Sequence, residues 1–413
     1  MKDILSSRKV LFALICCFTA IAAVDALLPG RIFFPDENFY IGEACSIAET
    51  GSLVGYGFYR AFGMPLTGMI YSIFYKLFGG GAVFIRSVRI FQAFLHILTA
   101  IGGASIAYSI FKNRCTALIV LFAVIVYPSL LAYQATTMSE TIFTFFLVWG
   151  MAFLYMWRGG CDKIFVAAVF TMMLSLYTKA VITTLIPVLI AARSLFVTDS
   201  WRERVKYTLI SCVLFIVCVT PWWIRNWSVF GEFVPFTTSA SWNLYLGNNP
   251  VNKHVGVDWN TDVDLEKVRE IHALNDELLI SKAFSEEAKS YIMANKAEFV
   301  RNAWLKFKRF WNFQSNYEGD KYSLAFRLYN LSLLLSWGIA CPLGLFSVFL
   351  SRKKWKELLP IFLLVLYYTF IHIVVIASLR YRLPIEPFFI ILGADCLTRL
   401  RSGSMPFSHP NCP

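Results

Sequence analysis

Long apolar stretches alternate with short polar connections along most of the 413-residue chain. Many of these stretches approach the roughly 20 residues that an α-helix needs to cross a bilayer. The pattern predicts about ten membrane-spanning helices, in the ranges 10–28, 88–111, 115–131, 142–157, 164–177, 181–196, 207–223, 324–350, 358–378 and 384–397. The predicted fold class is therefore an all-α polytopic membrane protein.

Two long segments interrupt this alternation and divide the chain into five predicted parts. These parts are 1–28 (N-terminus and first spanning helix), 29–87 (first outer loop, with an acidic motif and an interfacial helix), 88–223 (spanning helices two to seven), 224–323 (second outer loop, largely helical) and 324–413 (spanning helices eight to ten and the C-terminus).

Composition agrees with a membrane protein, because 57% of the residues are hydrophobic, 15% are charged and the mean hydropathy is +0.59. A soluble core could not cover this much apolar surface. The ten cysteines form no CxxC pair, so neither a disulfide framework nor a cysteine metal cluster is expected.

Lysine and arginine predict the orientation, since cytoplasmic loops are enriched in them. They flank alternate spans, as Lys2, Arg8 and Lys9, Lys112 and Arg114, Arg158 and Lys163, Arg202, Arg204 and Lys206, Arg352, Lys353, Lys354 and Lys356, and Arg399 and Arg401. This places both termini in the cytoplasm and both long loops on the outer face of a cytoplasmic (inner) membrane. The net charge of +12 is then a consequence of topology, and no nucleic-acid partner is expected.

The outer loops contain two stretches that predict helices at the membrane surface. Residues 65–78 are rich in aromatic and aliphatic side chains and are followed by three glycines, residues 79–81. Residues 262–313 contain few Gly or Pro, and their last part mixes aromatic with cationic side chains. Such a helix either rests on anionic headgroups or packs on the spanning bundle, and both interpretations stay open.

The candidate chemistry begins with adjacent carboxylates, Asp36 and Glu37, placed about eight residues after the first apolar stretch and hence at a membrane surface. Later in the chain, Asn248 and Asn249 lie in a turn-forming cluster that suits a binding loop.

Several segments together resemble the polyprenyl-phosphate-sugar-dependent glycosyltransferases of the GT-C superfamily, which includes protein O-mannosyltransferases and the lipid A aminoarabinose transferase. The matching segments are 36–40, 65–79 with Arg89, 138–140, 221–226 with 230–231, 243–250 and 380–387. One departure is the segment 62–65, where close members of the family carry a Glu-Lys-Pro-Pro-like run. The contact that this lysine makes with the carrier phosphate must then fall to another cation or be absent.

The resemblance implies roles for individual residues. Asp36 would be the catalytic carboxylate, beside Glu37, and would take a proton from the acceptor hydroxyl. The candidates for contacts with substrate or phosphate are Arg382, Arg380, Arg225, Lys179, Tyr40, Glu140, Asn248 and Asn249. Each cation could instead extend to lipid headgroups, Glu140 could simply favour a helix N-terminus, and Tyr40 could be a core residue.

The implied activity is an inverting transfer of a monosaccharide from undecaprenyl or dolichyl phosphate to an acceptor outside the membrane. A cell-envelope glycan or glycolipid, such as lipopolysaccharide or O-antigen, is the favoured acceptor, and a protein is the alternative. A flippase of lipid-linked sugars and a non-catalytic scaffold are rivals. No cofactor is firmly predicted, although a divalent cation (Mg or Mn) stays open because one or two carboxylates suffice for a hydrated Mg²⁺.

Overall fold

The computed structural model describes residues 7–160, 163–258, 261–314 and 324–402. These residues form helices and connections, and the β-structure among them is a single bridge between Gly55 and Tyr59. Lys2, one of the predicted cytoplasmic cations, lies outside the described residues, as do the ends of the first and last predicted parts.

Most of the predicted spans correspond to helices. The helices of the bundle are α2 (Arg8–Leu27), α5 (Ala82–Phe111), α6 (Arg114–Ile125), α7 (Pro128–Gln134), α8 (Glu140–Met156), α9 (Lys163–Thr178), α10 (Leu185–Val197), α11 (Trp201–Phe230), α16 (Leu324–Leu350), α17 (Trp355–Val374) and α19 (Glu386–Ser402). Those outside it are α3 (Glu37–Thr50), α4 (Leu66–Phe78), α12 (Ser239–Gly247), α13 (Leu265–His272), α14 (Glu277–Ala294), α15 (Lys296–Phe310) and the short α18 (Leu379–Arg382).

Five of the described helices are long and apolar enough to cross a membrane, or six if the bent pair α6–α7 counts as one span. The chain is thus a multi-pass membrane protein, and the number ten stays a prediction. The third predicted span, 115–131, is not one continuous helix, because α6 and α7 meet at an angle of 48°. Pro128 explains the break, since proline lacks an N–H and disfavours helical backbone in the residue before it.

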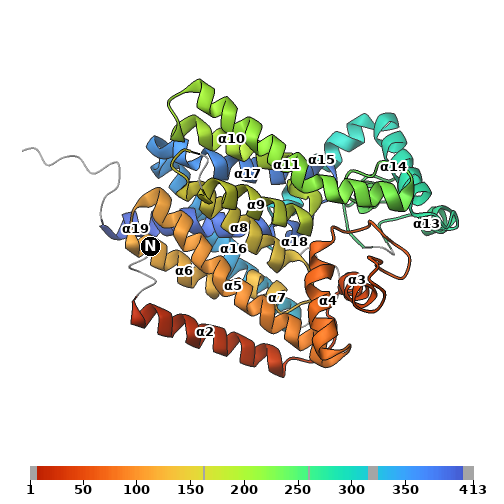
Figure 1. The fold of residues 1–413 in the computed structure, drawn as a ribbon, viewed down its shortest axis with the longest axis horizontal. Coiled ribbons are helices and arrows are strands. Elements are labelled where there is room, and N and C mark those ends of the chain that lie inside the picture. Colours follow the sequence, from red (N-terminus) through yellow and green to blue (C-terminus); the bar gives the residue numbers. More distant parts are fainter. Residues whose placement is uncertain (1–6, 161–162, 259–260, 315–323, 403–413) are drawn as a thin grey trace, which may run out of the picture.

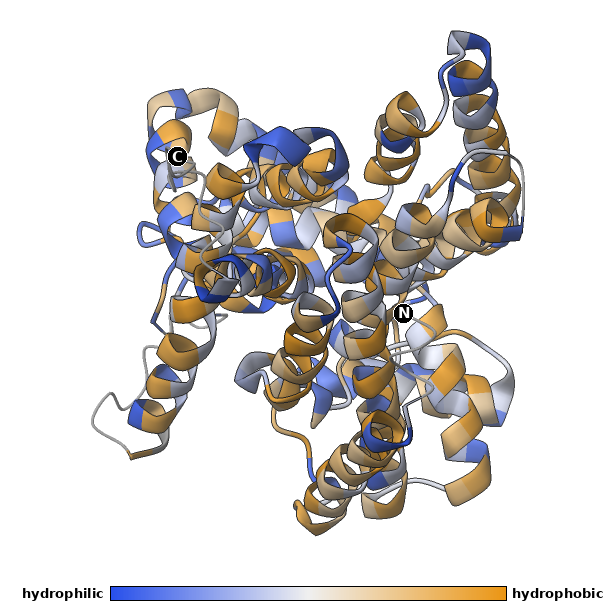
Figure 2. Cartoon of the chain, turned by 90° about the vertical axis from the view of Figure 1, so that its left-hand side faces the viewer, coloured by the Kyte–Doolittle hydropathy of each residue, from blue (hydrophilic) through white to orange (hydrophobic). Residues whose placement is uncertain are grey.

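The bundle has two distinct ends. Figure 1 shows the N-terminus and α19 at one end, and α13 and α14 at the other, with α3 and α4 on their side. Figure 2 views the molecule from the end that carries both termini and shows hydrophobic residues predominating along the helices. Many of them face outward, including Leu209, Ile216 and Leu335, as expected of a surface that lies against lipid.

Helix α5 lies at the centre of the bundle and packs against α2, α6 and α8. Most of its surface is buried. Gly102 and Gly103 let neighbouring helices approach closely, because a Cβ at Gly102 would lie 3.0 Å from the Val148 side chain and one at Gly103 would lie 3.3 Å from that of Val120. The rest of the core joins α16 to α19 and α10 to α17.

The two outer loops are tied together by one buried carboxylate. Glu277, at the start of α14, accepts hydrogen bonds from the backbone N–H groups of Arg60 (2.6 Å) and Ala61 (2.9 Å) and from the Thr238 hydroxyl (2.8 Å). Charged acceptors make the stronger hydrogen bonds. The first outer loop is therefore fixed against the second.

The predicted surface helices are present as α4 and α15. On α4, Met69, Ile73 and Leu77 are exposed at a spacing of four residues and form one apolar face. On α15, Val300 and Trp304 are exposed while Phe310 is buried. The C-terminal end of α15 packs on the bundle, and contact of the exposed faces with lipid stays a prediction.

Candidate active site

The segment before α3 is held by buried charged groups. Arg89, on α5, donates to the carbonyl oxygens of Pro29 and Arg31, both at 2.7 Å. Glu37 accepts from the N–H groups of Phe33 and Phe34 with one oxygen, and from the N–H and hydroxyl of Thr137 with the other. Every one of these bonds is to the protein itself, so the geometry gives Glu37 an orienting position and leaves Asp36 as the accessible carboxylate.

Asp36 lies directly before α3, and its side chain is 37% exposed. Arg380, on α18, donates from Nη1 to Asp36 Oδ2 at 2.5 Å. This ion pair joins the first outer loop to the connection between α17 and α19.

Glu140 extends the pair into a chain of four charges. Its Oε1 accepts from Lys179 Nζ at 2.7 Å and lies 3.2 Å from Arg380 Nε. The Glu140 side chain is 1% exposed, while Lys179 and Arg380 keep about a fifth of their side-chain surface exposed, 22% and 23%. The order is Asp36, Arg380, Glu140, Lys179, so that acids and cations alternate and their formal charges cancel. We call these four residues the charged cluster.

One atom of the charged cluster lacks a partner. Glu140 Oε2 is buried and has no hydrogen bond within the described part of the chain. A buried carboxylate oxygen without a donor is costly, and a ligand hydroxyl or a water would satisfy it.

Two tyrosines line the cluster. The Tyr40 hydroxyl lies 2.7 Å from Ser139 Oγ, and burial, followed by the charge of Glu140, raises the pKa of Tyr40 well above its usual value. Burial and then the charge of Asp36 raise the pKa of Tyr56 to about 12. Both phenols are thus neutral donors at physiological pH, and Tyr56 is exposed enough to meet a ligand.

Arg382 does not join the charged cluster. Its guanidinium pairs with Glu386 at 2.8 Å, and its Nη1 donates to the carbonyl oxygens of Phe310 and Asn312. It also lies 4.0 Å from the centre of the Trp337 ring, and its side chain is 1% exposed. These contacts make it a structural tie between α15, α16 and α19.

The remaining predicted residues also bond internally. Arg225 donates to Asn226 and to the Leu53 carbonyl. The amide groups of Asn248 and Asn249 are buried and bond to backbone groups, and Asn248 Oδ1 accepts from Lys306 Nζ at 2.9 Å. The loop 248–252 is a rigid turn held by its own side chains.

Sequence analysis did not single out Thr137 and Tyr56, and it included Ser139 only as part of the matching segment 138–140, with no role at the site. Thr137 and Ser139 lie within the three residues before Glu140, where a polar segment leads into an apolar helix. Hydroxyl residues at the start of a helix can be recognised in a sequence. Tyr56 lies between two glycines in a loop with φ of 50°, and no periodicity marks it.

The charged cluster does not suit a divalent cation. No group of three or more His, Cys, Asp and Glu side chains that could hold a metal ion occurs among the described residues. Asp36 and Glu140 both face the Arg380 guanidinium, whose charge would repel a cation between them. The charged residues as arranged therefore do not fit a metal ion.

Comparison with solved structures identifies the fold. The oligosaccharyltransferase of Archaeoglobus fulgidus, tethered with an acceptor peptide, superposes with a TM-score of 0.58 at 12% identity over 97% of this chain and 50% of that one. The same enzyme, AglB, in complex with an inhibitory peptide and a dolichol-phosphate, gives 0.51 at 12% identity over 98% and 53%. The chain thus spans about half the length of the oligosaccharyltransferase.

ArnT from Cupriavidus metallidurans, bound to undecaprenyl phosphate, gives a TM-score of 0.48 at 13% identity over 97% of this chain and 80% of that one. No family model and no curated protein matches the sequence. The likeness to the oligosaccharyltransferase confirms the predicted fold class, an all-α polytopic membrane bundle with a GT-C-like fold.

Proposed function

We propose that this protein is an inverting glycosyltransferase that moves a monosaccharide from a polyprenyl phosphate to an acceptor hydroxyl. The observation that carries the proposal is the charged cluster, in which an accessible carboxylate, Asp36, is bonded to a guanidinium, Arg380, on the outer-loop side of a GT-C fold. The dolichol-phosphate in the structure of AglB supports a polyprenyl phosphate as the class of lipid.

The proposed step needs one base and a receiver for negative charge. Asp36 takes the proton of the acceptor O–H while that oxygen forms a bond to the anomeric carbon. The bond between this carbon and the phosphate oxygen breaks, and the phosphate leaves with the electron pair. Attack opposite the leaving group inverts the anomeric configuration.

Arg380 pairs with Asp36, Lys179 shares Glu140 with Arg380, and both cations keep exposed surface. A guanidinium and an ammonium that are already in place stabilise the charge that develops on the departing phosphate. They would take the part of the lysine missing from the segment 62–65. Glu140 is a positioning residue in this proposal, because its Oε1 touches both cations.

Asp36 and Arg380 act as a unit in the proposed step. Arg380 Nη1 holds Asp36 and its Nε faces Glu140. This leaves Nη2, which makes a long 3.4 Å bond to the Tyr381 hydroxyl, to approach the phosphate. The exposed Tyr56 hydroxyl can bond to a sugar hydroxyl. Tyr40 supports the cluster through Ser139.

We infer that the site faces the outer side of a cytoplasmic membrane, because the cation-rich connections lie at the other end of the bundle. The favoured acceptor is a cell-envelope glycan or glycolipid such as lipopolysaccharide or O-antigen. A peptide hydroxyl is the second candidate, and the acceptor peptide tethered to the A. fulgidus enzyme supports keeping it.

The test compares wild type, Asp36→Asn and the control Glu266→Gln, which changes an exposed acid of the second outer loop. Purified protein in liposomes receives radiolabelled polyprenyl-phosphate sugars with envelope glycan or peptide acceptors. The expected result is transfer by wild type and control, and none by Asp36→Asn, which still binds the donor. Movement of the donor across the liposome membrane without transfer, at equal rates in all three proteins, would establish a flippase instead.

A further inference from the structure

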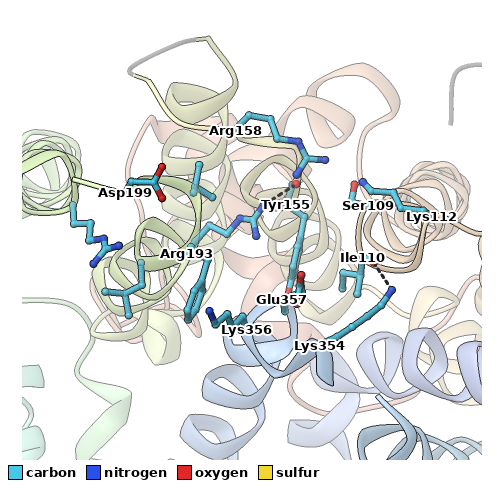
Figure 3. A pocket seen from close by; sticks show the side chains of 14 residues that line it. Ser109, Ile110, Lys112, Tyr155, Arg158, Arg193, Asp199, Lys354, Lys356 and Glu357 are labelled. Carbon is cyan, nitrogen blue, oxygen red and sulfur yellow. Dashed lines mark hydrogen bonds between the residues drawn. The ribbon is translucent and has the colours of Figure 1, made fainter. Parts of the chain in front are cut away.

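A cavity of about 670 Å³ lies far from the charged cluster, at the predicted cytoplasmic end of the bundle. Its lining comes from the C-terminal turns of α5, α8 and α10 and the connections that follow them, from the connection after α16, and from the first turns of α11 and α17. Figure 3 shows Lys112, Arg158, Arg193 and Lys354 around the hollow. We call it the basic pocket.

The charge of the basic pocket is unbalanced. Its cationic side chains are Lys112, Arg158, Arg193, Arg204, Lys354 and Lys356, and its acidic ones are Asp199 and Glu357. Within the described residues, no ion pair joins any of these cations to a carboxylate. The formal excess is four positive charges in one concave space, whereas loop cations placed only by membrane topology need not converge.

Three of the cations are held in place by carbonyl groups. Arg193 donates to the C-terminal end of α8, to Leu154 at 3.2 Å and to Tyr155 at 3.4 Å. Arg204 donates to Thr198, and Lys354 to Ile110 at 3.1 Å. Carbonyl oxygens orient these side chains but leave their full charge uncompensated, and a preformed array of cations is what an anion requires.

The cations also act on one another. Partial burial lowers the pKa of Lys112, and the positive charges of Arg158, Arg193 and Lys354 lower it further. An anion in the basic pocket would remove this repulsion.

A second hollow adjoins the basic pocket at two shared lining residues and is apolar. It has a volume of about 220 Å³, lies between α10 and α11, and shares Leu195 and Arg204 with the basic pocket. Leu195, Val205 and Leu209 are exposed along it, on helices that the fold places in the bilayer. We call it the acyl groove, because an anionic head and a hydrocarbon tail would fit the two hollows together.

We propose that the basic pocket and the acyl groove form one binding site for an anionic phospholipid, with its phosphate among Lys112, Arg158 and Lys356 and its acyl chain between α10 and α11. The cavity volume lies in the range of small-molecule sites. The adjoining apolar groove favours a lipid over free phosphate.

The test measures lipid binding to the delipidated full chain in detergent, by native mass spectrometry and by the shift of the thermal unfolding midpoint. The probes are cardiolipin, phosphatidylglycerol, phosphatidylcholine and inorganic phosphate. The double variant Arg158→Gln/Lys356→Gln is compared with Arg202→Gln/Lys353→Gln, which removes two exposed cations of the same face that do not line the pocket. Without lipid, both should unfold at the midpoint of wild type.

We expect cardiolipin and phosphatidylglycerol to stabilise wild type and the control, and to bind the pocket variant roughly tenfold or more weakly, since each cation near a lipid surface contributes about 1 kcal/mol. Leu195→Trp, which fills the acyl groove, should weaken lipid binding in the same way. Equal losses in the pocket and control variants would overturn the proposal, because the charge effect would then be general. Equal stabilisation by inorganic phosphate, with no effect of Leu195→Trp, would overturn the assignment to a lipid.

Discussion

Arg380 Nη1 donates to Asp36 Oδ2 at 2.5 Å across 344 residues of sequence. The same guanidinium lies 3.2 Å from Glu140 through Nε. One planar group thus links a carboxylate of the first outer loop to one at the start of α8. A lysine has a single nitrogen and could not hold both at these positions.

Replacing Arg380 should therefore be costly even when the charge is kept. We expect Arg380→Lys to lower kcat/KM for the lipid donor at least about tenfold, and Arg380→Gln to lower it further, because two charge-assisted contacts are lost. Steady-state kinetics with the radiolabelled donor gives both values. Arg31→Gln, which removes an exposed cation of the first outer loop, should match wild type. A fully active Arg380→Gln would refute the role of Arg380 in the reaction.

Glu140→Gln should affect stability as well as donor binding. The change leaves Lys179 and Arg380 close together without the carboxylate between them. Breaking a buried pair costs about 3–5 kcal/mol, and we expect the lower part of this range because both cations are partly exposed. Chemical denaturation in detergent measures the loss.

A double-mutant cycle that combines Glu140→Gln with Lys179→Met separates the interaction between these two residues from the other effects of each substitution. If the pair matters, Glu140→Gln/Lys179→Met should be more stable than Glu140→Gln alone. Strictly additive losses would show that Glu140 and Lys179 do not interact in the folded protein.

Arg382 should behave differently from Arg380 although only one residue separates them. Its bonds to Glu386, Phe310 and Asn312 are all internal. We expect Arg382→Lys to lower the thermal unfolding midpoint, because a lysine cannot reproduce the buried guanidinium's bonds to three partners. The folded fraction should keep kcat/KM within about twofold, because no substrate contact is lost. Normal stability with loss of donor affinity would place Arg382 in the substrate site after all.

The contrast between the two arginines shows where sequence reasoning stopped. The sequence predicts that both lie in a short polar link between spans and that both are candidates for binding phosphate. The link instead contains α18, and residues two apart on a helix do not share a face. Arg380 therefore reaches the charged cluster while Arg382 turns into the bundle.

Other parts of the fold were easier to predict. Apolar stretches of bilayer length gave the positions of most bundle helices, because this signal is local. The pairing of Asp36 with Arg380 is not local, and no periodicity encodes it. The asparagines of the loop 248–252 show a third case, since the residues that suit a binding loop also suit a turn that satisfies its own amides.

Lys306 provides a test of how the outer helices hold the site. It is buried on α15, and its Nζ donates to Asn248 Oδ1 and to the carbonyl oxygens of Val374 and Val375, at the end of α17. Nearby, the ring of His372 stacks on Phe310 of α15 and on Tyr381 of α18. Lys306 thus fixes the turn that leads to α18, which carries Arg380.

The pH dependence of stability should reveal this lysine. Burial lowers the pKa of Lys306 from 10.5 to about 7. Between these two values the unfolded chain binds more protons at this position than the folded protein does, so the contribution of Lys306 to stability rises with pH across that window. Lys306→Met removes the titration, and the difference in unfolding midpoint, wild type minus variant, should grow from pH 7 to pH 10.

Lys308→Met is the matched control, because Lys308 lies on the same helix and is exposed. Its difference from wild type should stay flat over the same range. The two variants share the background titration of all other groups, which cancels in each difference, so a rise confined to Lys306→Met can come only from the buried ammonium. A flat or falling difference for Lys306→Met would mean that its three acceptors keep the ammonium charged, and the desolvation that lowers its pKa would then be outweighed by its hydrogen bonds.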